Sequence, residues 1–136
     1  MNAELVNIGG FADRDLRGID QWQTRSESDI AFATIFPTVA TVGTPHYSMR
    51  WRLVGKECIG QLTFYSSTSV ASTAPVDYFL LPVTAGGIVG RADVVDNTGL
   101  IAIGQGVVSV SNSRCYLPWF APTAHVIGVY FSYEVQ

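Results

Sequence analysis

Charged side chains are scarce in this sequence. Its 136 residues include 8 lysine and arginine residues and 11 aspartate and glutamate residues, so only 14% are charged, whereas about a quarter is usual for a globular domain. With a formal net charge of -3, the chain lacks the cationic stripe that a phosphate backbone requires, and we expect no nucleic-acid partner. No uncharged apolar run approaches the roughly 18 residues of a membrane-spanning helix, so we expect no membrane insertion. Because 48% of the residues are apolar, a chain of this length can build one domain around a sizeable core.

Cysteine and histidine are also rare, with two residues of each. Cys58 and Cys115 lie in apolar, alternating stretches, which favours buried free thiols over a disulfide. His46 and His125 each stand beside a proline-containing turn, and neither has a second metal ligand at a recognisable spacing. We therefore expect no metal and no cofactor.

Motifs of catalytic sites are missing as well. The sequence has no Gly-x-Ser-x-Gly nucleophile elbow, and Gly104-Gln105-Gly106 is not a phosphate loop because no Gly-Lys-Ser/Thr follows it. Asp93 and Asp96 could be paired carboxylates, but Asp96 precedes Asn97-Thr98-Gly99 and is more typical of a residue that caps a turn. These observations predict that the protein is not an enzyme.

The few charges are unevenly distributed along the chain. Residues 1–56 contain twelve charged side chains, whereas residues 57–136 contain only seven. The closing stretch 126–135 also carries apolar residues on both faces, which a monomer would leave partly exposed. Both features are typical of a subunit covered by another copy of the same chain, since homo-oligomer interfaces resemble a domain core cut in half. The sequence therefore predicts a homo-oligomer.

Alternation of apolar and polar residues dominates from residue 46 onward. The stretches 46–54 and 58–65 alternate on either side of Gly55-Lys56, which predicts a β-hairpin. The stretch 66–75 is small and polar and is expected to be a long surface loop. Further strands are expected at 76–83, 88–95, 100–103, 107–111, 114–120 and 126–135. Short strands separated by turn signals predict an all-β fold, an antiparallel β-sandwich or barrel.

Residues 1–45 differ from the rest of the chain, because neither a helical stripe nor a clean alternation is evident before residue 30. Such a segment rarely folds alone, so we expect residues 1–45 to be an extended N-terminal arm that a partner surface orders. Residues 46–136 are expected to form a self-sufficient β-sandwich head. Trp22 should be the strongest anchor, because tryptophan often dominates an interface. The arm residues expected to contact the partner are Leu5, Ile8, Phe11, Leu16, Ile19 and Trp22.

Large aromatic residues form the remaining candidate site. Trp119 and Phe120 stand between Pro118 and Pro122, where an extended loop would display both rings. They could close the open end of the sandwich, contact another subunit or offer a platform for a sugar, and the sequence leaves these alternatives open. The residues of this candidate interface or ligand platform are Trp51, Tyr116, Trp119 and Phe120.

Four stretches of the alternating region together resemble a known family. They are Tyr-x-x-Arg-Trp-x-Leu-Val-Gly-Lys at 47–56, Cys-Ile-Gly-Gln-Leu-Thr-Phe at 58–64, Phe-Leu-Leu-Pro-Val at 79–83 and Val-Tyr-Phe-Ser-Tyr-Glu-Val at 129–135. In pattern and order they are similar to the trimeric jelly-roll heads of tailed-bacteriophage virion proteins. The resemblance implies a jelly-roll fold, a place in the virion and a homotrimer in which flat sheet faces meet on the three-fold axis.

This resemblance implies two functions. Tail-fibre heads bind sugars or proteins of the host surface, whereas decoration, or cement, proteins bind the major capsid protein and stabilise the shell. A fibre head normally follows a long shaft, and only 45 residues precede the expected sandwich here, so we favour a capsid decoration protein attached through its N-terminal arm. The alternative is a tail-fibre or tail-tip receptor-binding protein that recognises a host-surface glycan or protein.

Overall fold

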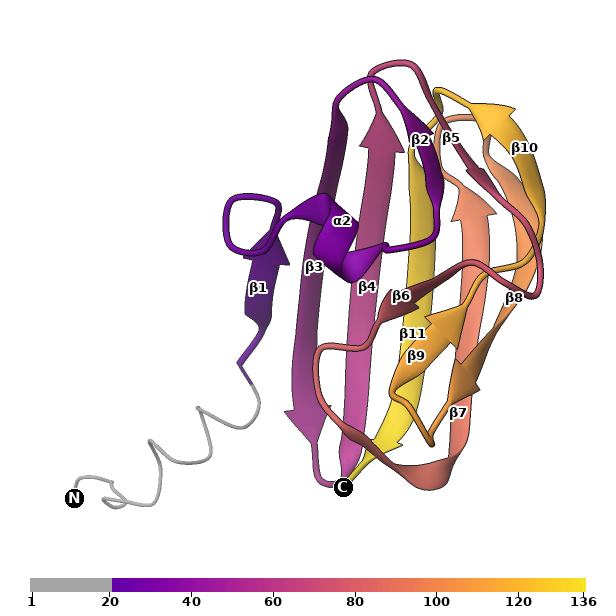
Figure 1. Cartoon of the computed structure of the whole chain (residues 1–136). Coiled ribbons are helices and arrows are strands. Elements are labelled where there is room, and N and C mark those ends of the chain that lie inside the picture. Colours follow the sequence, from indigo (N-terminus) through magenta and orange to yellow (C-terminus); the bar gives the residue numbers. More distant parts are fainter. Residues whose placement is uncertain (1–20) are drawn as a thin grey trace.

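The folded part of the chain consists almost entirely of β-strands. This computed structural model describes residues 21–136, without the side chains of residues 88 and 89 (Figure 1). The elements of this part are β1 (Gln23–Ser26), α2 (Phe32–Ile35), β2 (Ala40–Val42), β3 (Pro45–Val54), β4 (Glu57–Ser66), β5 (Ser69–Ser72), β6 (Tyr78–Leu80), β7 (Ala85–Asp96), β8 (Ile101–Ser109), β9 (Arg114–Tyr116), β10 (Phe120–Thr123) and β11 (Ile127–Val135). The all-β class predicted from the sequence is confirmed.

The strands form two sheets that lie against each other. The larger one is curled and antiparallel, with the strand order β1-β3-β4-β11-β7-β8-β9-β6, and the smaller one has the order β10-β5-β2. The large sheet curls within β8, because residues 101–106 of this strand pair with β7 and residues 107–109 pair with β9. The strands β9 and β6, the small sheet and α2 therefore cover the concave side of the large sheet, which gives a sandwich-like arrangement (Figure 1).

The predicted hairpin is formed by β3 and β4. Their register is unbroken from Pro45 opposite Ser66 to Val54 opposite Glu57. Gly55 in the turn has a φ of 61°, a conformation that glycine adopts at little cost. β11 pairs with β4 on one side and with β7 on the other, so this closing strand lies in the middle of the large sheet.

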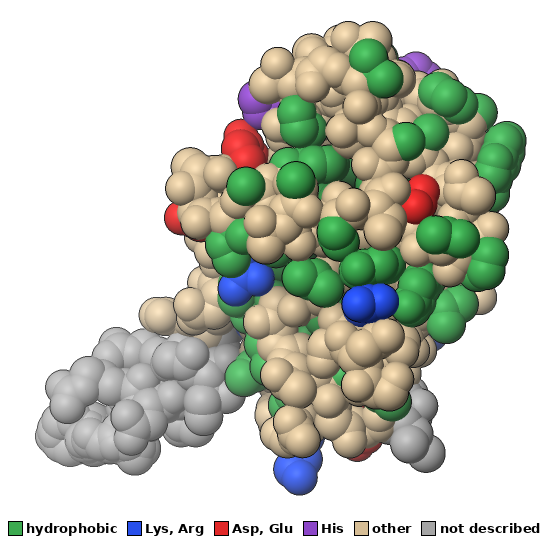
Figure 2. Space-filling model, in the orientation of Figure 1, with side chains coloured by type: hydrophobic (Ala, Val, Ile, Leu, Met, Phe, Trp, Pro, Cys, Tyr) green, Lys and Arg blue, Asp and Glu red, His purple; other side chains and the backbone are tan. Residues whose placement is uncertain are grey.

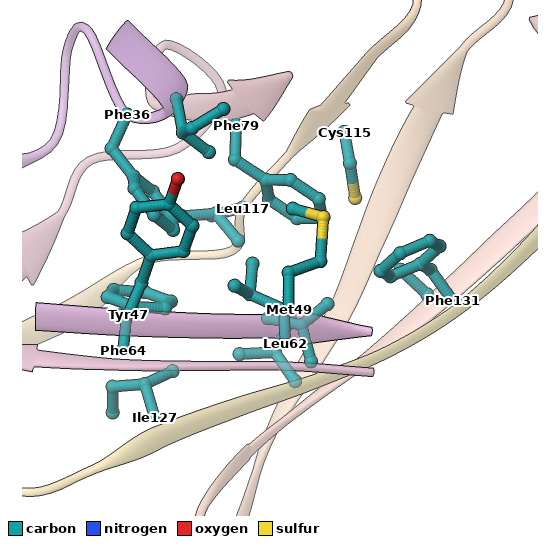
Figure 3. Close-up of a cluster of buried hydrophobic side chains, with 14 of the residues drawn as sticks. Phe36, Tyr47, Met49, Leu62, Phe64, Phe79, Cys115, Leu117, Ile127 and Phe131 are labelled. Atoms are coloured by element: carbon teal, nitrogen blue, oxygen red, sulfur yellow. The ribbon is translucent and has the colours of Figure 1, made fainter. Parts of the chain in front are cut away.

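The core between the two layers is rich in aromatic rings. The ring centroid of Phe36 lies 4.7 Å from that of Phe64 on β4 and 6.0 Å from that of Phe79 on β6, so these rings join the two layers (Figure 3). Both cysteines are buried free thiols, as the sequence favoured, and burial raises the pKa of Cys115 to about 12. Neither Cys58 nor Cys115 is therefore available as a reactive thiolate.

Residues 23–45 do not belong to a separate arm. β1 pairs with β3, β2 pairs with β5, and the side chains of Phe32, Ile35 and Phe36 are buried in the core. The boundary expected after residue 45 is therefore wrong, because a single helical turn and the residue after it carry these three side chains into the sandwich. Five of the expected arm contacts, Leu5, Ile8, Phe11, Leu16 and Ile19, lie outside the described residues.

Two further expectations about the strands are corrected. The Ser/Thr-rich stretch expected to be a loop contains β5, the central strand of the small sheet, with Val70 and Ser72 buried. The two strands expected on either side of Gly104-Gln105-Gly106 are one continuous strand, β8. A Cβ at Gly106 would lie 2.8 Å from the backbone oxygen of Tyr116, so glycine permits a close approach within the bend.

Candidate interaction surfaces

The convex side of the large sheet exposes a polar face, which we call the outer face. It is formed by the side chains of β3, β4, β11 and β7 that alternate with the buried ones. These outward residues include His46, Ser48, Arg50, Arg52, Val54, Glu57, Ile59, Gln61, Thr63, Tyr65, Arg91, Asp93, Val95, Tyr130, Ser132 and Glu134. The closing strand β11 turns Tyr130, which is 45% exposed, and Ser132 outward, so its outward face combines an aromatic ring with a polar side chain.

Trp22 stands at the edge of the outer face, just before β1. The centre of its ring lies 4.5 Å from Arg50 Cζ and 5.2 Å from Arg52 Cζ, and 37% of the residue is exposed. Arg50 Nε donates a hydrogen bond to Gln61 Oε1 at 3.1 Å, whereas the buried Arg52 Nε has no partner among residues 21–136. Two guanidinium groups thus share one indole ring, and cation–π attraction holds Trp22 against the folded unit.

The four aromatic residues of the other candidate site are not brought together. Trp51 is half-buried and faces the concave side, beneath an arginine of β1, and Tyr116 lies in β9 at the far end of the large sheet. Phe120, the first residue of β10, is 6% exposed and packs in the core. Trp119 is 65% exposed, because adjacent residues of an extended segment point in opposite directions. Among these four residues, Trp119 alone stays a candidate contact.

A second exposed surface is apolar and follows β8. We call it the β8 patch; its residues Leu100, Ile101 and Val107 have exposed fractions of 88%, 64% and 64%. Residues 97–113 carry no charge. Figure 2 shows hydrophobic side chains gathered on the side where Figure 1 places β8 and β10.

The turn that leads into β8 is held by hydrogen bonds. Asp96 Oδ1 accepts from the Gly99 N–H at 2.7 Å, and Asp96 Oδ2 pairs with His125 Nδ1 at 2.7 Å. Thr98 Oγ1 accepts from the Val126 N–H at 3.0 Å. The Gly99 N–H, and then His125, lower the pKa of the Asp96 carboxyl below its usual range. Asp96 caps the turn, as predicted, and also ties it to the connection before β11.

His46 forms a similar pair at the start of β3. Its Nδ1 lies 3.0 Å from Glu27 Oε2, and Glu27 Oε1 accepts from the Tyr47 N–H at 3.0 Å. The hydrogen bonds from His46 and Tyr47 lower the pKa of Glu27 to about 2. A hollow of about 310 Å³ beside this pair is lined by Ser26, Glu27, His46, Tyr47, Ser48, Thr63 and Tyr65.

The two histidines therefore pair with carboxylates on separate elements and do not meet each other. Within residues 21–136, no group of three or more side chains could hold a metal ion. Over the same residues, no helix has the length and apolar character needed to cross a membrane.

Comparison with known proteins identifies no relative of this chain: no family model, no curated protein and no solved structure matches it.

Proposed function

We propose that this protein is a non-enzymatic structural protein of a bacteriophage virion, a homotrimer that binds the major capsid protein and stabilises the shell. The proposal includes a jelly-roll topology for the sandwich and extends the resemblance seen in the sequence. The observation that carries it is the β8 patch, where three large apolar side chains are exposed on a stretch without charge. Monomeric soluble proteins rarely expose such a patch, whereas a subunit buries it on assembly.

The attachment arm of this proposal is the part of the chain before β1. Because residues 23–45 belong to the sandwich, the arm comprises residues 1–22 and is shorter than the sequence indicated. Trp22 is its last residue and contacts the outer face through Arg50 and Arg52. Interface hot spots are enriched in tryptophan and arginine. The arm and the adjoining edge of the outer face would therefore bind the capsid protein together.

A second candidate function is recognition of a host-surface glycan by a tail-fibre or tail-tip protein. The hollow beside Glu27 and His46 favours it, because it combines an ionised carboxylate, several hydroxyl groups and the Tyr65 ring, which is 39% exposed. Carboxylates and hydroxyls bind sugar hydroxyl groups, and an aromatic ring packs on the apolar face of a sugar. Among residues 21–136, no comparable feature favours an enzyme.

Immunogold electron microscopy separates the two functions. Virions of the phage that encodes this chain would be labelled with an antibody raised against the folded protein, and pre-immune serum would serve as the control. We expect gold particles over the capsid. Gold confined to the tail would overturn the decoration function in favour of the receptor-binding one, and virions without gold would overturn both.

A further inference from the structure

Two exposed tyrosines stand on the outer face, each beside a hollow. Tyr65 of β4 is 39% exposed and borders the hollow that also contains Glu27 and His46. Tyr130 of β11 is 45% exposed and borders a second hollow of about 230 Å³. The other polar side chains that line this second hollow are those of Gln61, Arg91, Asp93 and Ser132. Aromatic rings exposed in this way can pack on the apolar face of a ring-shaped ligand.

The strand β4 connects the two hollows. Thr63 lines the first hollow, and Gln61, the next outward residue of β4, lines the second. Gln61 lies opposite Tyr130, so Tyr65 and Tyr130 are separated by four residues along β4 and by one strand, about 14 Å in a regular sheet. Hydrogen-bonding groups therefore lie between the two rings. We call the surface formed by Tyr65, Thr63, Gln61 and Tyr130 the tyrosine strip.

An arginine without an acidic partner lies beside the middle of the tyrosine strip. Arg50 is exposed, lies opposite Gln61, and belongs to none of the ion pairs within residues 21–136. Its Nε donates to Gln61 Oε1 at 3.1 Å and its guanidinium lies over the ring of Trp22, so the group is held in place while its two Nη atoms face a ligand. Arg52, the next outward residue of β3, belongs to none of these ion pairs either.

The charged groups at the two ends of the strip are already paired. Glu27 Oε2 lies 3.0 Å from His46 Nδ1, and Asp93 Oδ2 lies 3.8 Å from an Nη atom of Arg91. Among residues 21–136, the uncompensated charge beside the strip is therefore that of Arg50 and its neighbour. A guanidinium group binds a carboxylate through two parallel hydrogen bonds. A complementary ligand thus carries a carboxylate near its middle and a ring on either side of it.

We propose that the tyrosine strip binds a linear acidic oligosaccharide, with a carboxylate of the ligand on Arg50 and two of its sugar rings on Tyr65 and Tyr130. The inference rests on the second candidate function, glycan recognition, and deepens it by naming the whole site and the class of glycan. A sugar chain is favoured over a peptide because Thr63 and Gln61 present hydroxyl and amide groups between two aromatic rings, and sugar rings offer both hydroxyl groups and apolar faces.

Isothermal titration calorimetry with the full chain tests the strip. The ligands are hexagalacturonate, a hyaluronan hexasaccharide and a hexamer of sialic acid, each compared with its methyl ester. We expect at least one of these acids to bind with one oligosaccharide per chain. Its methyl ester should bind at least about 10-fold more weakly, because the charge-assisted hydrogen bonds to arginine are lost. Binding of the acid should also weaken as the salt concentration rises.

Three variants assign the contacts. Arg50→Gln, Tyr65→Ala and Tyr130→Ala should each weaken binding of that acid at least about 10-fold. The matched control is Lys56→Gln, which removes the same charge in the turn at the far end of the β3 and β4 hairpin, and it should bind like the wild type. Circular dichroism verifies that each variant keeps the wild-type strand content.

The outcomes separate this inference from the proposed functions. Binding of an acid that survives both Arg50→Gln and Tyr130→Ala would overturn the strip and leave a glycan site beside Glu27 standing. Hexaglutamate that binds as tightly as the best sugar, with the same dependence on Arg50, would overturn the glycan in favour of an acidic protein segment. No binding of any of the three sugar acids would overturn the strip, whereas immunogold labelling would still decide between capsid and tail.

Discussion

The side chain of Phe131 occupies the space above Gly60, its direct cross-strand partner. Gly60 takes an inward position of β4, and a Cβ there would overlap the Phe131 ring. The ring is 3% exposed and its centroid lies 5.7 Å from that of Phe79 in the opposite layer. Absence of a side chain at residue 60 therefore lets an aromatic ring of β11 bridge the two layers at the centre of the large sheet.

Gly60→Ala should destabilise the protein by about 1–3 kcal/mol, the usual cost of overpacking a core. The free energy of unfolding, measured by urea denaturation, checks this value. Gly104→Ala is the matched control, because a Cβ at this strand position would lie at an ordinary contact distance of 3.4 Å from Pro118. Equal effects of the two substitutions would contradict the close approach of Phe131 to Gly60.

A chain that begins at Thr44 should not fold, whereas one that begins at Gln21 should fold like the full chain. The shorter chain lacks the strands β1 and β2. It also lacks Phe32, Ile35 and Phe36, whose three side chains are buried in the core. Phe36→Ala alone should cost about 3–5 kcal/mol. Circular dichroism and thermal melting check each case. A cooperative melting transition for the chain from Thr44 would contradict the place of residues 23–45 in the sandwich.

The parts of the fold that could be predicted are those in which one face of a strand is buried. The hairpin of β3 and β4 and the inward residues of β11 follow from alternation, because a strand turns successive side chains to opposite faces. The cap at Asp96 follows from its place before Asn97-Thr98-Gly99, since an aspartate at the start of a turn accepts a backbone N–H. Both signals are local in the sequence.

The parts that could not be predicted depend on long-range packing. β5 has one large apolar residue, Val70, among small polar ones, and its burial comes from two neighbouring strands that are distant in sequence. The glycines of β8 resemble turn residues, yet they allow a bend within one strand. The exposure of Leu100 arises from the backbone of a turn and is not encoded in residue type.

The pair of Glu27 and His46 should make the protein sensitive to acid. The pKa of Glu27 is about 2 in the folded chain and about 4.5 when unperturbed, so at acidic pH the unfolded chain binds a proton that the folded chain does not. The contribution of this pair to the free energy of unfolding is therefore fully present above about pH 4.5, and it is lost as the pH falls toward 2. In Glu27→Gln the loss of melting temperature across this range should be smaller than in the wild type.

The control for this experiment is Glu57→Gln, at an exposed carboxylate at the opposite end of the β3 and β4 hairpin. Its melting temperature should fall with pH as steeply as that of the wild type. If Glu27→Gln had the wild-type slope as well, the hydrogen bonds of Glu27 with His46 and Tyr47 would not persist in solution.

Trp22→Ala should reduce binding to the virion while the protein stays folded. Trp22 lies outside the core, and a cation–π contact at an exposed site contributes about 0.5–1 kcal/mol, so the two contacts with Arg50 and Arg52 account for at most about 2 kcal/mol of unfolding free energy. Loss of a tryptophan hot spot in an interface costs about 2 kcal/mol or more, equivalent to about 30-fold in affinity. Fluorescently labelled protein, titrated onto virions assembled without the wild-type chain, measures binding directly.

Two further variants make this last prediction specific. Trp22→Phe keeps an aromatic face over both guanidinium groups and should retain part of the binding, whereas Val76→Ala, at an exposed residue far from the arm in sequence, should bind like the wild type. Binding of Trp22→Ala at the wild-type level would show that the arm junction is not the attachment site. A Trp22→Ala chain that no longer folds would instead make Trp22 a structural part of the sandwich, because loss of the two cation–π contacts alone lowers the unfolding free energy by at most about 2 kcal/mol.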